Sequence, residues 1–481
     1  MQRQEIFDYC RSFGKVPIFR KIYADFHTPV LLLQKIAKQS NDYYLFESVK
    51  EKRWSRYSFL GLSPNLIIEI NDGKLIEFEN GEKKCVFDNA IEYLKSLFDR
   101  YNSPCIEGLP VFTGGAVGYF GYESAKYFDN AIKFHSPKID DLPDIKLMFI
   151  DNLIVFDHYE QYLYLIANMD SSCNLEAEYE RCNKVLDELE DIIQKECNYA
   201  PKGNFKPPIF KSNTAKEQYI ENVKKAKQYI KKGDIFQIVP SQRFCADFED
   251  SLFDVYRNLR LINPSPYLYY IKMGDLEIAG CSPETLIHIV GKEVITYPIA
   301  GTRKRGKTQE EDRALEKELL NDPKEISEHN MLVDLGRNDI GKISAIGSVE
   351  VRNYLSVERY SHVMHLTSVV AGKLKDGVHM IDALGAVLPA GTLSGAPKIR
   401  AMQIIDELEP HGRGIYGGSI CYFGYNGNMD CCIAIRTVVK NKGKINIQSG
   451  GGIVLDSIPE EEYEESLNKA KALFSALEAA K

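Results

Sequence analysis

Short runs of alternating hydrophobic and polar residues recur in the first third of the chain. They include YYLFESV, NLIIEI and KLIEFE, and each has the length of one strand with one side packed on a core. The longest run, NLIVFDHYEQYLYLIAN at 152–168, predicts a β-hairpin with its turn at 158–161. From about residue 43 to 170 we therefore predict a mostly antiparallel sheet.

The pattern changes after this sheet. Residues 173–198 are polar with helical spacing of their apolar positions, which predicts a helix. The following stretch, YAPKGNFKPPIFKSN, is rich in Pro, Gly and Asn, as is typical of a connection. We place a boundary near 200–213 and predict two domains, an N-terminal one at 1–205 and a catalytic one at 214–475.

The second part mixes both periodicities. Helices are predicted at 215–233, 310–335, 378–387, 397–408 and 459–480. Strands are predicted at 236–244, 268–273, 276–280, 286–290, 293–300, 419–425, 431–440 and 445–450. Since the strands outnumber the helices and do not alternate regularly with them, the pattern favours an α+β fold with antiparallel sheets.

Composition narrows the class of protein. Of 481 residues 44% are hydrophobic and 27% charged, as in an ordinary globular protein. The net charge of -8 is spread along the chain, so neither a nucleic-acid face nor a polybasic membrane patch is indicated. Eleven cysteines without a CxxC pair fit reduced thiols better than disulfides or a zinc site. With no signal pattern and no apolar run of roughly 18 residues, we expect a cytoplasmic protein.

Two pairs of glutamates have a spacing that suits chemistry. Glu325 and Glu328 are three residues apart in a predicted helix, and so are Glu462 and Glu465 in another. If the two faces meet, the carboxylates repel one another unless a cation neutralises them, and oxygen ligands favour Mg²⁺. An ordinary acidic helix start after 456–459 explains the second pair equally well, and this alternative stays open.

Small residues and one arginine suggest an anionic substrate. The segments SGGG at 449–452 and PAGTLSGAPK at 389–398 offer accessible backbone amides for an anion. Arg436 stands alone in the apolar run CCIAIRTVV, where it binds either a structural carboxylate or a substrate. A small substrate with carboxylates would explain the glutamates, the glycines and Arg436 together.

A candidate nucleotide-binding loop is the alternative from another class. Residues 301–308, GTRKRGKT, match the phosphate-loop pattern G-x-x-x-x-G-K-[ST]. Their context opposes this reading, because the loop interior is basic, the following helix opens with acids and no parallel βαβ unit surrounds it.

Five segments in order carry a family resemblance. PIAGTR, DLGRNDIGKI, PAGTLSGAPK, IAIRT and SGGGIVLDS resemble the motifs of the chorismate-utilising enzymes, and the resemblance covers about 214–473. It implies an α/β sandwich of antiparallel sheets flanked by helices. The 200 residues before this region resemble the N-terminal domain of the same family.

The resemblance also implies roles for single residues. The direct Mg²⁺ ligands would be Glu328 and Glu465, with Glu325 and Glu462 as supporting carboxylates. The residues that would hold chorismate are Gly301, Thr302, Tyr416, Arg436, Gly450, Gly451 and Gly452. His365 and Thr392 would lie against the ring, and Glu284 would be the general acid for the departing 4-hydroxyl, which requires a carboxyl protonated at neutral pH.

Two positions separate the branches of this family. Relatives that add water to chorismate carry Lys where Gln237 stands, and relatives that aminate the 4-position commonly carry a nucleophilic Lys where Ala300 stands. The sequence therefore resembles the large subunits of anthranilate synthases, in which ammonia attacks C2 and pyruvate is then lost. The aminodeoxychorismate synthases of folate biosynthesis are the alternative.

Two further segments imply feedback inhibition in tryptophan biosynthesis. LFES at 45–48 and NPSPYLYY at 263–270 resemble the tryptophan pocket of anthranilate synthases. The inhibitor-site candidates are Glu47, Ser48, Pro266, Tyr267 and Leu268. The family more often has Met where Leu268 stands, and a half-buried strand is the structural alternative for LFES.

The chain contains no recognisable source of ammonia. A triad glutaminase needs a Cys on a Gly-flanked elbow and a later His-x-Glu, and the His158–Glu160 match falls in the predicted hairpin turn without such an elbow before it. We therefore expect a separate glutamine amidotransferase subunit and a hetero-oligomer. A silent scaffold that only binds this partner is a further alternative.

Overall fold

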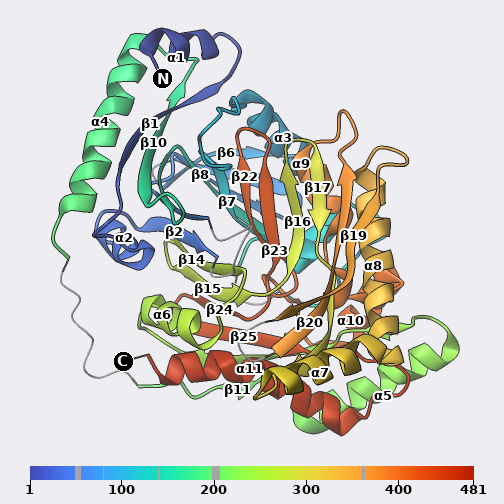
Figure 1. Ribbon diagram of the computed structural model, residues 1–481. Coiled ribbons are helices and arrows are strands. Elements are labelled where there is room, and N and C mark those ends of the chain that lie inside the picture. Colours follow the sequence, from blue (N-terminus) through green and yellow to red (C-terminus); the bar gives the residue numbers. More distant parts are fainter. Residues whose placement is uncertain (49–55, 80, 139–140, 198–205, 360–362, 481) are drawn as a thin grey trace.

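The computed structural model describes residues 1–48, 56–79, 81–138, 141–197, 206–359 and 363–480. These residues form a sandwich of two antiparallel β-sheets with helices against both outer faces (Figure 1). The predicted α+β class and the sandwich of antiparallel sheets are confirmed. In the described part of the chain, no helix combines the length and the hydrophobicity that a bilayer crossing requires.

The first sheet joins strands from both ends of the sequence. In spatial order it contains β1 (Lys15–Tyr23), β10 (Tyr162–Asp170), β9 (Asn152–Asp157), β3 (Tyr57–Leu62), β2 (Asp42–Glu47), β14 (Tyr267–Met273), β15 (Leu276–Ser282), β24 (Thr437–Asn441), β25 (Lys444–Gly450), β13 (Ser241–Asp247) and β11 (Lys211–Ser212). The β9–β10 hairpin has the register that the sequence predicts.

The second sheet is equally mixed. In spatial order it contains β18 (Ile299–Lys304), β20 (Val363–Lys373), β17 (Glu293–Thr296), β16 (Thr285–Val290), β23 (Met429–Ile433), β22 (Ser419–Gly424), β7 (Gly115–Phe120), β8 (Ile145–Ile150), β4 (Leu66–Asn71), β5 (Lys74–Glu79) and β6 (Glu82–Phe87), and β19 (Glu350–Arg359) also pairs with β20. A small ribbon pairs β12 (Gln237–Ile238) with β21 (Gly395–Ala396).

The helices divide between the two outer faces. The first sheet is covered by α1 (Arg3–Tyr9), α2 (Pro29–Ile36), α4 (Leu175–Gln194), α6 (Phe253–Ile262) and α11 (Pro459–Glu478). The second sheet is covered by α3 (Ala90–Arg100), α8 (Pro323–Ile343) and α9 (Met380–Val387). Three further helices are α5 (Lys216–Lys232), α7 (Gln309–Asn321) and α10 (Lys398–Leu408). The described residues also form two 3-10 turns, η1 (Tyr122–Tyr127) and η2 (Gly391–Leu393).

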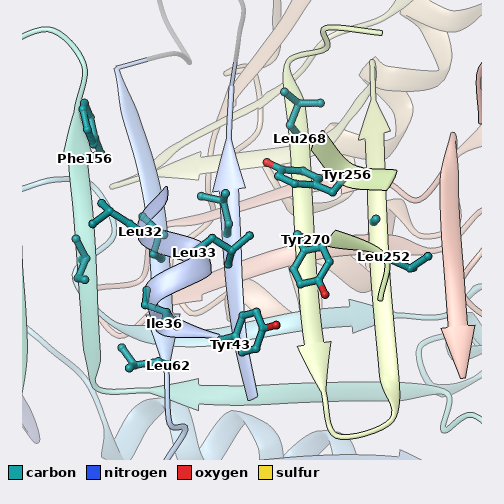
Figure 2. Close-up of a cluster of buried hydrophobic side chains, with 14 of the residues drawn as sticks. Leu32, Leu33, Ile36, Tyr43, Leu62, Phe156, Leu252, Tyr256, Leu268 and Tyr270 are labelled. Atoms are coloured by element: carbon teal, nitrogen blue, oxygen red, sulfur yellow. The ribbon is translucent and has the colours of Figure 1, made fainter. Parts of the chain in front are cut away.

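Central strands are buried on both faces, which explains their nearly continuous hydrophobic runs. In β2, Tyr43 and Leu45 face the helices while Tyr44 between them faces the other sheet. Figure 2 shows the helix-facing side, where Leu33 of α2 and Tyr256 of α6 lie over neighbouring strands. The core between helix and sheet therefore continues across strands from distant parts of the sequence.

Strands on either side of the predicted boundary share both sheets. In the first sheet β2 pairs with β14, and in the second β7 pairs with β22. Residues 198–205, where part of that boundary falls, lie outside the described residues. The division into 1–205 and 214–475 stays a prediction about sequence segments.

Several predicted elements are broken in two. The helix expected at 310–335 is α7 and α8, separated at Asp322, whose side chain caps α8 ahead of Pro323. The strand expected at 431–440 is β23 and β24, because Arg436 takes a left-handed backbone conformation with φ 50°. The strands expected at 236–244 and 293–300 are also divided, at 239–240 and 297–298. Periodicity alone does not show these breaks.

Candidate functional site

The two glutamate pairs, one on α8 and one on α11, lie within electrostatic range of each other. The charge of Glu465 on α11 raises the pKa of Glu328 on α8. Gly451 lies between them and the sheet, because a Cβ at this glycine would stand 3.1 Å from Oε2 of Glu462. The tertiary structure thus brings together carboxylates that are 137 positions apart, from 328 to 465.

This cluster has the chemistry of a divalent-cation site. Oε2 of Glu462 is buried without a hydrogen-bond partner. Partial desolvation raises the pKa of Glu328 although its side chain stays accessible, and the neighbouring Glu325 raises it further. Burial, and then Glu465, raise the pKa of Glu462 against the effect of Ser457. Among the described residues no ready-made group of metal ligands is found, but these oxygens fit a hard cation such as Mg²⁺.

Two cationic side chains already neutralise part of the cluster. Lys469 Nζ lies 2.8 Å from Oε1 of Glu465 and 3.1 Å from the carbonyl oxygen of Gly450. Arg303 donates to Oε1 of Glu325 at 3.0 Å. Lys469 did not figure among the predicted site residues, although its position four residues after Glu465 on a helix is a recognisable signal.

The three consecutive glycines let neighbouring segments approach the backbone closely. A Cβ at Gly450 would lie 2.2 Å from the carbonyl oxygen of Pro240, and one at Gly452 would lie 2.8 Å from Nε2 of Gln237. Tyr416 reaches this segment, since its hydroxyl hydrogen-bonds with the backbone of Gly450. Burial raises the pKa of Tyr416, so that its hydroxyl stays protonated and can donate.

Gly301, Thr302 and His365 form a second edge of the site. In the β18–β20 pair Thr302 stands opposite His365, and Nδ1 of His365 lies 3.0 Å from Oγ1 of Thr302 and 3.1 Å from the carbonyl oxygen of Gly301. Since a carbonyl oxygen accepts, this contact requires a proton on Nδ1. Gly301 has φ 63° at a bulge in β18, which a residue with a side chain would adopt only under strain. The imidazole is therefore held in one orientation.

Glu284 is the carboxyl best suited to act as an acid. It faces a pocket of about 470 Å³ that Thr392 and Gly391 also line. Burial raises the pKa of Glu284 to about 7, although the Thr392 hydroxyl and then Arg436 lower it. The Thr392 hydroxyl donates to Oε1 of Glu284 at 3.0 Å. A large share of this carboxyl is thus protonated at neutral pH.

Glu284 and Arg436 both lie where the chain passes from one sheet to the other. Glu284 lies between β15 of the first sheet and β16 of the second, and Arg436 lies between β23 of the second and β24 of the first. Nη1 of Arg436 contacts Oδ1 of Asn263 at 3.3 Å. The positive charge of Arg436 also acts on the carboxyl of Glu284, whose pKa it lowers, so the two groups lie near each other at this crossing.

A buried arginine supports three parts of this site. Arg413 pairs with Glu409 at 2.5 Å and donates to the carbonyl oxygens of Leu393 and Val239, both at 2.6 Å. Its guanidinium lies 5.7 Å from the ring centre of Tyr416. Arg413 thereby ties together the segments that carry Thr392, Gln237 and Tyr416. It is absent from the predicted site residues, and only its setting between glycines at 412–414 marks it in the sequence.

The five inhibitor-site candidates line a separate pocket of about 480 Å³. Leu268 of β14 stands opposite Glu47 of β2, which joins the two predicted segments. Glu47 is already bound, at 2.5 Å to the Tyr256 hydroxyl and by an ion pair with Arg260. Oγ of Ser48, in contrast, is buried and has no hydrogen-bond partner among the described residues. The pocket therefore offers an unsatisfied hydroxyl among apolar and aromatic side chains.

The candidate phosphate loop has no vacant phosphate cradle. The backbone N–H of Gly306 donates to Asp312 at 2.7 Å, and that of Lys307 donates to Glu311 at 2.6 Å. Arg303 and Arg305 are engaged by acidic side chains of α7 and its neighbourhood. The amides that would bind a phosphate are occupied by carboxylates, so the nucleotide-binding reading has no support in the structure.

Comparison with known proteins shows the family of the chain. The pattern of the family described as chorismate binding enzyme matches residues 41–475. Anthranilate synthase component 1 of Acetivibrio thermocellus is 46% identical over 98% of this chain and 97% of its own. The counterpart from Pseudomonas putida is 44% identical over 97% and 96%.

Solved structures show the same relationship. Anthranilate synthase component I from Streptococcus pneumoniae TIGR4 superposes with a TM-score of 0.77 at 38% identity, over 94% of this chain and 99% of its own. The menaquinone-specific isochorismate synthase of Escherichia coli, at 16% identity and a TM-score of 0.72 over 99% and 98%, shares the fold. The chain belongs to the chorismate-binding enzyme family, and within that family to the component I chains of anthranilate synthase.

Proposed function

We propose that the chain converts chorismate and ammonia into anthranilate, pyruvate and water, with Mg²⁺ and with ammonia from a separate glutaminase subunit. The main support is Glu284, a carboxyl with a pKa of about 7 that lies beside Thr392 and Arg436 at the crossing between the sheets. The names of the relatives, each a component 1 of anthranilate synthase, support the reaction and a second component.

Substrate binding follows from the charges of the site. Arg436 and the Tyr416 hydroxyl would hold the pyruvyl carboxylate, and the backbone of 450–452 with Gly301 and Thr302 would hold the ring carboxylate. Glu328 and Glu465, assisted by Glu325 and Glu462, would hold Mg²⁺, which supplies positive charge for the ring carboxylate.

Bond changes at the ring need an acid and no basic lysine. Ammonia attacks C2 with its own lone pair, the double bond shifts, and Glu284 gives its proton to the departing 4-hydroxyl, which leaves as water. The amine then loses a proton, and elimination of pyruvate makes the ring aromatic. Ala300 is buried in β18 and Gln237 borders Gly452, so neither position offers a covalent nucleophile or a base for water.

We also propose that the pocket at Ser48 and Tyr267 binds tryptophan as a feedback inhibitor. Its aromatic lining suits an indole, and the Ser48 hydroxyl, which has no hydrogen-bond partner among the described residues, suits the polar end of an amino acid. Ser48→Ala should raise the tryptophan concentration needed for half inhibition. Unchanged activity in millimolar tryptophan would remove this part of the proposal only.

Product identification tests the main reaction. Purified chain with chorismate, Mg²⁺ and an ammonium salt should give anthranilate, measured by its fluorescence, and should give none with glutamine in place of ammonium. Formation of 4-amino-4-deoxychorismate as the sole product would reject the proposal in favour of aminodeoxychorismate synthesis. No turnover with any nitrogen source would indicate a scaffold.

A further inference from the structure

A largely buried lysine closes the base of the loop that carries Thr392. Val387 ends α9 and Lys398 begins α10, and we call the residues between them, 388–397, the Thr392 loop. Nζ of Lys398 donates to the carbonyl oxygen of Val387 at 3.0 Å and to Oδ2 of Asp339 at 2.9 Å. Since Asp339 belongs to α8, the two ends of the loop are tied to each other and to this helix.

The middle of the Thr392 loop also contacts α8, where Leu335 lies against Gly391. A Cβ added at Gly391 would stand 1.8 Å from Cδ2 of Leu335, and the next nearest atoms are Cγ and Cδ1 of the same side chain. Leu335 and Asp339 are four residues apart on α8, so the two contacts lie on one face of the helix. The loop is therefore held by α8 both at its base and at Gly391.

The Leu335 side chain has little freedom to avoid a larger residue at position 391. Rotation about its Cβ–Cγ bond moves the two methyl groups but leaves Cγ 3.1 Å from a Cβ added at Gly391. Carbon atoms prefer separations of about 3.5–4.0 Å, so this distance is still too short. A methyl group at this position would therefore displace the loop as well as the leucine.

The contact reaches Glu284 through Thr392. Thr392 directly follows Gly391, and its hydroxyl donates to Oε1 of Glu284 at 3.0 Å. A donor and an acceptor about 3.6 Å apart no longer form a hydrogen bond, so a displacement of roughly half an ångström breaks this one. The pocket that Glu284 faces is lined by Leu335 as well as by Gly391 and Thr392. The position of Gly391 against Leu335 therefore decides whether the bond forms.

Two cationic groups act on Glu284 besides the Thr392 hydroxyl. Arg436 and Lys469 lower the pKa of its carboxyl, and they lie between β23 and β24 and on α11, outside α8 and the Thr392 loop. Leu335 is uncharged, so its replacement changes the pKa of Glu284 in one of two ways. Loss of the Thr392 bond raises this pKa, whereas entry of water lowers it. The direction of the shift separates the two.

We propose that Leu335 is a positioning residue, which holds Gly391 in place and thereby keeps the Thr392 hydroxyl on Glu284. This inference rests on the proposed function, in which Glu284 donates a proton to the departing 4-hydroxyl. Groups that react must be held to within about half an ångström of their working positions by side chains that are themselves fixed by packing. Leu335 carries no group that transfers a proton, and it acts through Thr392.

A methyl group added at Gly391 tests the contact. In Gly391→Ala, at constant free ammonia, the falling limb of kcat/KM for chorismate should move to higher pH by about half a unit to one unit, because the Thr392 bond is lost. Gly391 lies in the 3-10 turn η2 without a positive φ, so its backbone accepts Ala. Leu335→Ala alone should move the limb in the same direction, because Gly391 then has room to shift.

Combining the two changes gives the sharpest comparison. Gly391→Ala with Leu335→Ala should return the limb most of the way to its position in the parent, because the added methyl group occupies space that the leucine leaves. Gly391→Ala with Ile340→Ala is the matched control. Ile340 is also buried on α8, but it faces β20, where its Cγ2 lies 3.0 Å from the position of a Cβ at Gly372. The control should keep the limb where Gly391→Ala alone puts it.

A limb that Gly391→Ala leaves in place would overturn the inference. So would a Leu335→Ala combination that lies no closer to the parent than the control. A limb that moves to lower pH in Leu335→Ala would show that this side chain only shields Glu284 from water. These results reject the role of Leu335 alone if Thr392→Val still moves the limb. If Glu284→Gln leaves the pH profile unchanged, the proposed role of Glu284 fails, and this inference fails with it.

Discussion

The hydroxyl of Tyr267 lies 2.8 Å from Oγ1 of Thr285. Tyr267 lines the proposed tryptophan pocket, and Thr285 directly follows Glu284 in the chain and lines the pocket that Glu284 faces. A second connection runs parallel to the first, since Asn263, at the start of the same NPSPY segment, contacts Arg436. Arg436 and the residue that follows Glu284 therefore contact the segment proposed to bind tryptophan.

Removing the first connection should weaken inhibition more than binding. Tyr267→Phe removes this bond and also the bond that the hydroxyl donates to Oδ1 of Asp430 at 2.8 Å. Since one such bond contributes about 1 kcal/mol, we expect at least about a fivefold rise in the tryptophan concentration for half inhibition. The tryptophan Kd, measured by calorimetry, should change less, because the ring remains in the pocket. Thr285→Val removes only the bond between Tyr267 and Thr285 and leaves the bond to Asp430, so it should give about a fivefold rise. Equal changes in Kd and inhibition would contradict coupling through this bond.

The rate should depend on the protonation of Glu284. With free ammonia held constant, kcat/KM for chorismate should fall as pH rises through about 7, because the carboxyl then loses the proton it must donate. Glu284→Gln should lower kcat by about 10²- to 10⁴-fold and abolish this limb of the profile.

Thr392→Val should shift the same pH profile of kcat/KM. The Thr392 hydroxyl lowers the pKa of Glu284 by hydrogen bonding to the carboxylate. Without it the pKa should rise further, and the falling limb should move to higher pH. A limb that moves to lower pH, or one that stays in place, would argue against Glu284 as the proton donor.

Glu284 should also make stability depend on pH. Its pKa is about 7 in the folded chain against an ordinary 4.5, so above 4.5 the unfolded chain loses a proton that the folded chain retains. Stability is therefore lost as pH rises from about 4.5 to 7. Glu284→Gln should therefore raise the free energy of unfolding by roughly 3 kcal/mol at pH 8 and leave it unchanged near pH 4. Thermal unfolding at the two pH values checks this, and equal shifts at both would contradict it.

The acidic cluster predicts a metal-specific loss. Glu465→Gln should reduce activity by more than about a hundredfold at saturating Mg²⁺, since the cation contributes several kcal/mol to charge stabilisation. Glu464→Gln is the matched control, because Glu464 pairs with the exposed Lys216 at 3.0 Å and points away from the cluster partners. Titration of Mg²⁺ by calorimetry gives a readout independent of turnover. Equal Mg²⁺ affinity in both variants would remove Glu465 from the ligands.

Arg413 should be a large contributor to stability. Arg413→Met leaves Glu409 buried without its cation, which we expect to cost about 3 to 5 kcal/mol in unfolding experiments. Replacing both, as Glu409→Gln with Arg413→Met, should recover much of this loss because no buried charge remains. An Arg413→Met variant as stable as the parent would show that the ion pair with Glu409 does not contribute to stability.

Local patterns carried most of the element predictions. The β9–β10 hairpin and the helix α11 follow from alternation and from helical spacing with a Pro start, because these depend on neighbours in the sequence. The wrong predictions were those in which one predicted element is divided into two in the structure. The run at 431–440 reads as one strand, but Arg436 turns the chain from the second sheet to the first. No local preference announces that turn, because contacts with both sheets impose it.

The sequence by itself determined the sandwich class, the family resemblance and the chemistry available, since the glutamate spacing and the glycine run are local. Only the tertiary structure decided that Glu328 and Glu465 come within electrostatic range and that β2 joins β14, because both depend on packing between distant segments. Nor could the sequence show that Glu284 has a pKa of about 7, since burial by residues far along the chain sets that value. The sequence shows which residue types are present and in which order, whereas the fold sets the environment of each.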